Sequence, residues 1–175
     1  MNMLTFVKIF MDMRKVEFEP YLFSESVEIY AIKIKGDLCS EYRKFFIKYK
    51  DSEDKILRSD LAEIVKSIEK MTQEGVLEAY FRNEGKMNDR VCAIPVDIAW
   101  RNKKKGSLRV YCIRVSDRLL ILGGGGHKKT KTYQEDEELF EKVKFLQMID
   151  ERLVLLETSG VDIHKEIINI ELNID

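Results

Sequence analysis

The chain has 175 residues and a net charge of −1, with 45% hydrophobic and 35% charged residues, 9 Gly and 2 Pro. This length can enclose a hydrophobic core, and the composition excludes a chain that is disordered throughout or of low complexity. The charge excludes a uniformly basic nucleic-acid-binding domain, and no apolar run approaches the roughly 20 residues of a membrane helix. We therefore expect one cytoplasmic domain over residues 1–175.

The N-terminal third predicts strands followed by two helices. Residues 15–35 alternate apolar and polar side chains, which indicates one or two strands. Residues 39–50 carry four aromatic residues at helical spacing, which predicts a first helix with an aromatic core face. Residues 59–75 carry an apolar stripe at the same spacing, with Ser59 or Asp60 as the N-cap and a glycine as the stop.

The middle of the chain predicts three strands and charged loops. Residues 81–90 have the composition of a loop, and residues 91–97 indicate a short strand that ends at Pro95. The charged residues 101–107 predict a second loop. Residues 108–123 then predict two strands of a β-hairpin.

The C-terminal third predicts a long helix and one more strand. The glycines at 123–126 end the hairpin and let the strand bend or approach another backbone closely. A long helix follows, with capping-box spacing between Thr132 and Glu135 and its end at Gly160. The alternating tail, residues 164–175, predicts an edge strand or an interface strand. This order of elements predicts an α+β fold with a largely antiparallel sheet.

The glycine run does not match a nucleotide-binding loop. A P-loop needs a lysine and a hydroxyl directly after its last glycine, whereas His127 follows Gly126 here. The dinucleotide fingerprint also lacks its final glycine. The acidic run EDEE that opens the next helix complements the helix dipole and would repel a phosphate. We therefore disfavour nucleotide binding.

The cysteines and histidines indicate neither a metal site nor a cofactor. Cys39, Cys92 and Cys112 lie far apart, without a C-x-x-C pair or histidines at zinc spacing. We expect three reduced, buried thiols. The only histidines are His127 and His164, which are not clustered with acids.

A basic zone surrounds the hairpin inside this near-neutral chain. It comprises Arg101, Lys103, Lys104, Lys105 and Arg109 before or at the first strand, and Lys128, Lys129 and Lys131 after the second. Alternation places Arg109 and Tyr111 on one face of the first strand. If the helices cover the other face, these two residues form an open cationic and aromatic surface that ends at His127 and the lysines.

Such a surface suits single-stranded RNA, because basic groups neutralise phosphates and an aromatic ring stacks on a base. A bound phosphodiester can be cleaved by its own 2′-hydroxyl, with cations that stabilise the pentacovalent oxygens, one base and one acid, and no metal. His127 is the only nearby group that titrates near neutral pH unaided.

The order strand, helical hairpin, "LRVYCI…RLLILGGGGHKKTKTY" and final helix resembles the RelE/HigB branch of the RelE/ParE toxin-antitoxin superfamily, over about residues 29–153. The resemblance implies a RelE-like fold, a small and largely antiparallel sheet packed by a helical hairpin and a long C-terminal helix. This chain adds strand extensions at both ends. The resemblance also implies a bacterial type II toxin, a ribosome-dependent mRNA endonuclease (mRNA interferase) that inhibits translation by metal-independent 2′-hydroxyl attack.

The same resemblance implies the partners and the site residues. The partners are an antitoxin protein, mRNA and the ribosome, with no membrane and no cofactor; a homodimer through the terminal strands is a further expectation. The catalytic candidates are Arg109, His127, Lys128, Lys129 and Tyr133. The RNA-binding candidates are Arg82, Lys86, Lys103, Lys104, Lys105, Tyr111 and Lys131.

A second interpretation stays open beside the first. The chain is near-neutral, lacks lysines in residues 91–97, and has Tyr133 where the family often has a proline. These departures favour a non-catalytic RelE-like module that binds protein or RNA, so enzymatic activity is an open question. In that case Arg109 is an exposed strand arginine paired with an acid, His127 is a loop residue without chemistry, and the lysines are solvated charge.

Overall fold

The computed structural model describes residues 14–84, 90–96 and 107–174. Its strands are β1 (Arg14–Phe23), β2 (Glu28–Ile34), β3 (Arg82–Asn83), β4 (Val91–Ile94), β5 (Ser107–Arg114), β6 (Leu119–Lys128) and β7 (Glu171–Ile174). Its α-helices are α2 (Glu41–Lys50), α3 (Lys55–Glu74), α4 (Glu137–Thr158) and α5 (Ile163–Glu166). Short 3₁₀ turns are η1 (Glu78–Tyr80), η2 (Tyr133–Glu135) and η3 (Ile167–Asn169).

The strands form one open sheet in the order β3-β4-β5-β6-β2-β1-β7. The pair β2 and β6 is parallel, and the other pairs between described strands are antiparallel. The predicted α+β class with a largely antiparallel sheet is therefore confirmed. Both terminal strands belong to this sheet, because β7 pairs with β1, which pairs with β2.

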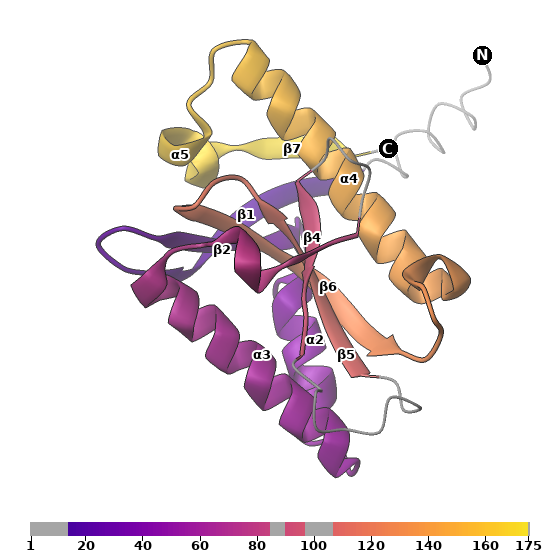
Figure 1. Ribbon diagram of the computed structural model, residues 1–175. Coiled ribbons are helices and arrows are strands. Elements are labelled where there is room, and N and C mark those ends of the chain that lie inside the picture. Colours follow the sequence, from indigo (N-terminus) through magenta and orange to yellow (C-terminus); the bar gives the residue numbers. More distant parts are fainter. Residues whose placement is uncertain (1–13, 85–89, 97–106, 175) are drawn as a thin grey trace, which may run out of the picture.

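Helices cover both faces of the sheet (Figure 1). Helices α2 and α3 pack on one face and α4 packs on the other, so the core has two layers. Strand β2 shows why: Ile29 and Ala31 lie in the α2/α3 layer, whereas Tyr30 and Ile32 lie in the α4 layer. No helix in the described part of the chain is long and apolar enough to cross a membrane.

Both long helices begin at other residues than the sequence pattern indicates. Helix α3 starts earlier than predicted, because the Asp54 side chain caps it by accepting a hydrogen bond from the Ile56 backbone N–H at 2.8 Å. The predicted cap at Ser59 or Asp60 is therefore wrong. Asp60 is fully buried, and its Oδ2 accepts a hydrogen bond from the Leu108 backbone N–H of β5 at 3.0 Å.

Helix α4 starts one turn late. The Asp136 side chain accepts a hydrogen bond from the Leu139 backbone N–H at 3.2 Å and so caps the helix. The capping box expected between Thr132 and Glu135 is wrong, because the chain there forms η2 and the Thr132 side chain makes no capping bond. The C-terminal tail also differs, since the strand covers only Glu171–Ile174 and helical turns precede it.

The four glycines lie inside β6 rather than after it. A Cβ atom at Gly125 would lie 2.0 Å from the carbonyl oxygen of Arg109, and one at Gly126 would lie 2.8 Å from a methyl group of Leu139 in α4. The predicted close approach to another backbone is confirmed. A register shift between Val110 and Cys112 places a β-bulge in this stretch of the hairpin.

Candidate functional site

Three basic residues from three strands lie on the α4 side of the sheet, at the end where β6 terminates. Both sequence neighbours of Arg109 pack in the α2/α3 layer, so alternation directs Arg109 to the α4 side. Lys128 pairs with Ser107, two residues before Arg109, and therefore shares that face. Arg82 pairs with Ala93, which belongs to the α4 layer. We call Arg82, Arg109 and Lys128 the basic cluster.

Two members of the basic cluster, Arg109 and Lys128, have a lowered pKa. Burial lowers the pKa of Arg109, which is only 6% exposed, and the charge of Arg82 lowers it further. Burial also lowers the pKa of the half-buried Lys128, and Arg109 and Arg82 add to this effect. Like charges held together in a partly desolvated place are a common feature of functional sites.

Carboxylates near the basic cluster raise the pKa of its members and so favour their charged forms. Glu84 favours the charged forms of both Arg109 and Lys128, and Glu135 favours the charged form of Lys128. Sequence reasoning missed both as members of the site. Glu84 follows Arg82 by two residues in a segment interpreted as a loop. Glu135 was interpreted as part of a capping box and of the acidic run that complements the helix dipole and would repel a phosphate.

The face that carries Arg109 and Tyr111 is closed. The expected open surface is wrong, because α4 covers this side and Tyr111 is 1% exposed. Burial and the charge of Glu84 raise the pKa of Tyr111. Its ring meets Tyr133 edge to face at 6.3 Å between centroids, and Tyr133 stacks on the more exposed Phe140 at 6.5 Å. Direct stacking of a base on Tyr111 does not fit this packing.

The structure separates His127 from the basic cluster. His127 pairs with Leu108, a residue of the α2/α3 layer, so its side chain lies on the opposite face from Lys128. Its backbone N–H donates to the Tyr49 hydroxyl of α2 at 3.1 Å. The expectation that His127 acts together with Arg109 is therefore wrong, because neighbouring residues of a strand face opposite sides.

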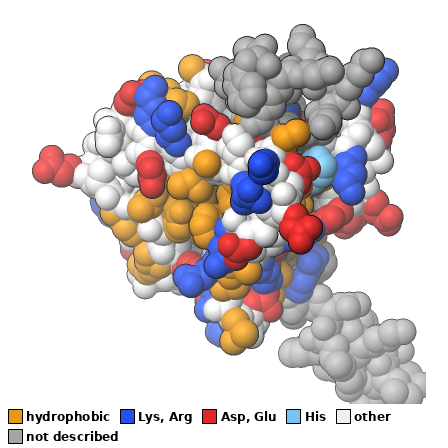
Figure 2. Space-filling view, turned by 90° about the horizontal axis from the view of Figure 1, so that it is seen from below, with side chains coloured by type: hydrophobic (Ala, Val, Ile, Leu, Met, Phe, Trp, Pro, Cys, Tyr) orange, Lys and Arg blue, Asp and Glu red, His pale blue; other side chains and the backbone are white. Residues whose placement is uncertain are grey.

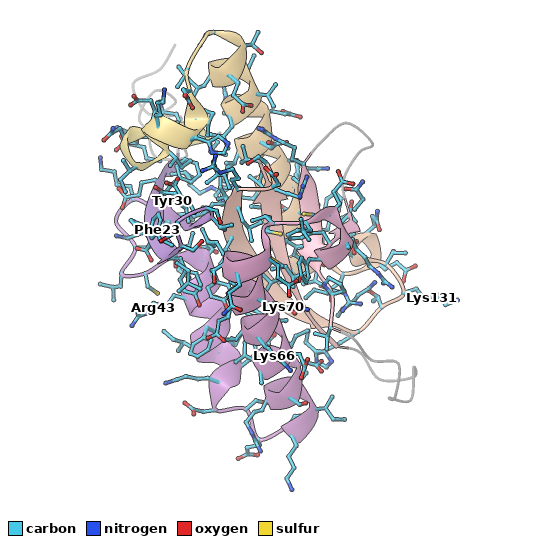
Figure 3. The ribbon with its side chains drawn as sticks, turned by 60° about the vertical axis from the view of Figure 1, so that its left-hand side comes forward. Phe23, Tyr30, Arg43, Lys66, Lys70 and Lys131 are labelled. Carbon is cyan, nitrogen blue, oxygen red and sulfur yellow. The ribbon has the colours of Figure 1, made fainter. Side chains whose placement is uncertain are left out.

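The remaining lysines of the hairpin lie in solvent. Lys129 and Lys131 are exposed after the end of β6, and Figure 3 shows Lys131 directed away from the body of the protein. The Lys131 backbone N–H donates to Glu135 Oε2 at 3.2 Å. The candidates Lys86, Lys103, Lys104 and Lys105 lie outside the described residues.

The surface at this end of the sheet carries mixed charge. Figure 2 views the molecule from the lower end of Figure 1 and shows basic and acidic side chains interspersed around apolar ones. The site therefore offers a local group of cations with carboxylates beside it. Such a group can bind a phosphodiester and can supply an amine of lowered pKa for proton transfer.

Comparisons of the chain with protein-family models, with curated proteins and with solved structures gave no match. Among the described residues, no three His, Cys, Asp or Glu side chains come together as a metal site. Arg114 lies on the other face of β5 from Arg109. Its Nε donates to the Val76 carbonyl at 2.7 Å.

Proposed function

We propose that this protein is a RelE/HigB-like toxin of a bacterial type II toxin-antitoxin pair, which cleaves mRNA on the ribosome. The observation that supports this most is the basic cluster, because three cations from β3, β5 and β6 are held together in a chain with a net charge of −1. An anionic ligand would relieve the repulsion between them. The order β2, α2 and α3, β4 to β6 and α4 agrees with the order on which the resemblance rests.

In this proposal, the exposed Arg82 and the half-buried Lys128 contact the scissile phosphate. Arg109 is buried, so it adds positive potential at the phosphate rather than a direct contact. The 2′-oxygen of the RNA attacks phosphorus, and the bond to the 5′-oxygen breaks. The cations stabilise the pentacovalent oxygens, and Lys128, whose pKa is lowered, exchanges a proton with a reacting oxygen.

The partners follow from the same site. An antitoxin would cover the basic cluster with acidic side chains or with an amphipathic helix and so exclude RNA. Tyr133, which is 8% exposed, would orient the RNA from the edge of the site. Contact with a second copy through β7 belongs to the same proposal, because β7 lies at one edge of the sheet.

A non-catalytic binding module is the alternative. The burial of Arg109 and Tyr111 favours it, and so do Glu84 and Glu135, which already offset part of the cluster's charge. Such a module would bind RNA or a protein through the basic cluster without cutting it.

Inducible expression in a bacterial host distinguishes the toxin from the non-catalytic binding module. We compare wild type with Lys128→Gln and with Lys66→Gln, which removes the same charge from an exposed position on α3, on the far side of the sheet. If the protein is a toxin, wild type arrests growth and produces translation-dependent cuts in a reporter mRNA, which primer extension detects. Lys128→Gln then loses both effects, and Lys66→Gln keeps both.

Normal growth with intact message at matched soluble wild-type protein would favour the binding module. If both lysine variants arrest growth equally, the basic cluster is not needed for the activity. Arg109→Ala is a second variant. Because Arg109 is buried, its removal can also destabilise the fold, so this variant is informative only when its circular dichroism spectrum matches that of wild type.

A further inference from the structure

Two cysteines face each other inside the sheet. Cys92 of β4 and Cys112 of β5 are register partners on antiparallel strands, and their Sγ atoms lie 3.6 Å apart. Both are free thiols, 3% and 0% exposed respectively. Since a disulfide has an S–S bond of about 2.05 Å, the two sulfur atoms need to approach by roughly 1.5 Å to form one.

A cavity gives access to one of the two. Its volume is about 400 Å³, and its walls include Cys92, Arg90 and Arg114. Cys112 is not part of its lining and is fully buried. A small oxidant that enters the cavity therefore meets Cys92 first.

Metal binding is the other chemistry that a close pair of thiols offers. A structural zinc site needs four ligands, and even a catalytic one needs three. In the part of the chain that the structure describes, no third His, Cys, Asp or Glu joins Cys92 and Cys112. The geometry therefore favours oxidation over metal binding.

We propose that Cys92 and Cys112 are a redox site, at which a hydroperoxide converts the two thiols into an intramolecular disulfide. The Cys92 sulfur attacks the peroxide O–O bond, which gives a sulfenic acid at Cys92 and releases one water molecule when hydrogen peroxide is the oxidant. The Cys112 sulfur then attacks the sulfenic sulfur, and the displaced hydroxide takes the Cys112 proton and leaves as a second water. Two thiols lose two electrons and the peroxide gains them.

The order of the two steps follows from burial. Burial raises the pKa of the Cys112 thiol, so this group stays protonated and reacts poorly with free oxidant. It becomes reactive only toward a sulfenic acid held beside it. The bond would join β4 to β5 next to Tyr111, where the register shift of the hairpin lies. This inference is independent of the proposed RNA chemistry.

The experiment treats the full-length purified protein with hydrogen peroxide, unfolds it, alkylates the free thiols and maps the peptides by mass spectrometry. Free thiols should fall from three to one, with a reducible link between Cys92 and Cys112 and an alkylated Cys39. Cys39→Ser should form the same link. A Cys112→Ser variant should trap a dimedone adduct at Cys92, whereas Cys92→Ser should give none at Cys112.

Full alkylation of both Cys92 and Cys112 after peroxide treatment would overturn the proposal. So would disulfides that join two chains, or a dimedone adduct at Cys112 in the Cys92→Ser variant, because either would show that the cavity does not direct the oxidant. Since wild type supplies the main result, a loss of folding in one variant leaves the proposal testable.

Discussion

Gly125→Ala should destabilise the fold strongly, whereas Gly124→Ala in the same strand should not. A Cβ at Gly125 would lie 2.0 Å from the carbonyl oxygen of Arg109 and 3.0 Å from a ring carbon of Phe45. Ordinary contact between a methyl carbon and an oxygen needs more than an ångström of extra separation. The obstacle is backbone on the neighbouring strand, so no side-chain rotation relieves it and β5 must move away from β6.

The size of the effect follows from this geometry. Overpacking of a close-packed core costs about 1–3 kcal/mol, and a clash with backbone places Gly125→Ala near the upper value, about 3 kcal/mol. For a chain of this length, 1 kcal/mol corresponds to about 2–4 °C, so Tm should fall by about 6–12 °C. At Gly124 the nearest atom to a new Cβ is Lys142 Cδ at 3.6 Å, and alanine also restricts the unfolded chain.

Thermal and urea unfolding followed by circular dichroism measure both variants. Gly124→Ala should melt within about 2 °C of wild type or above it. If Gly125→Ala melts as high as Gly124→Ala, the close approach of β5 and β6 is not as described and the position of Arg109 must be revised.

Four further predictions concern charged groups. Asp150→Ala should cost about 3 kcal/mol in urea unfolding, because it removes a buried carboxylate from its ion pair with the partly buried Arg90. Glu157→Ala, at the exposed end of the same network, should cost less than about 1 kcal/mol. Equal losses would contradict the difference in burial. Asp60→Ala should cost about 1–3 kcal/mol and speed amide exchange at the start of β5, since it leaves a buried N–H without its acceptor. RNA affinity should fall as the pH rises through the lowered pKa of Lys128, because phosphate prefers the charged amine, and Lys128→Arg should flatten this profile. The folded-state pKa of Lys128 lies below its unfolded value, so this residue's contribution to stability should rise with pH between those two values, and the rise should vanish in Lys128→Gln.

Hydrophobic spacing in the sequence was sufficient to predict the helices and strands whose pattern lies within one continuous segment. The β5–β6 hairpin and the aromatic face of α2 were predicted because period-two and helical spacing are visible in ten residues or so. The helix starts were misplaced because several residues near each start can cap. In the structure, Asp54 and Asp136 cap these helices in place of Ser59 and Thr132.

The candidate site could be predicted only in part, because its geometry depends on contacts distant in the sequence. That Arg109 and Tyr111 share a face follows from alternation, but that α4 closes this face depends on packing across the whole sheet. The bulge, the approach of Arg82 from β3, and the register that brings Cys92 opposite Cys112 likewise result from strand pairing. Alternation alone could have separated His127 from Lys128, had the strand been extended through the glycines.

The central claim is that the basic cluster supports metal-independent attack by an RNA 2′-hydroxyl. The most direct test uses purified protein, translating ribosomes and a reporter mRNA with a single 2′-deoxynucleotide at the mapped cleavage site, beside the same mRNA made entirely of RNA. We predict that the all-RNA message is cut to a 2′,3′-cyclic phosphate end and that the deoxy-substituted message stays intact at that site. Cleavage of the deoxy-substituted position, or an intact all-RNA message, would contradict the claim.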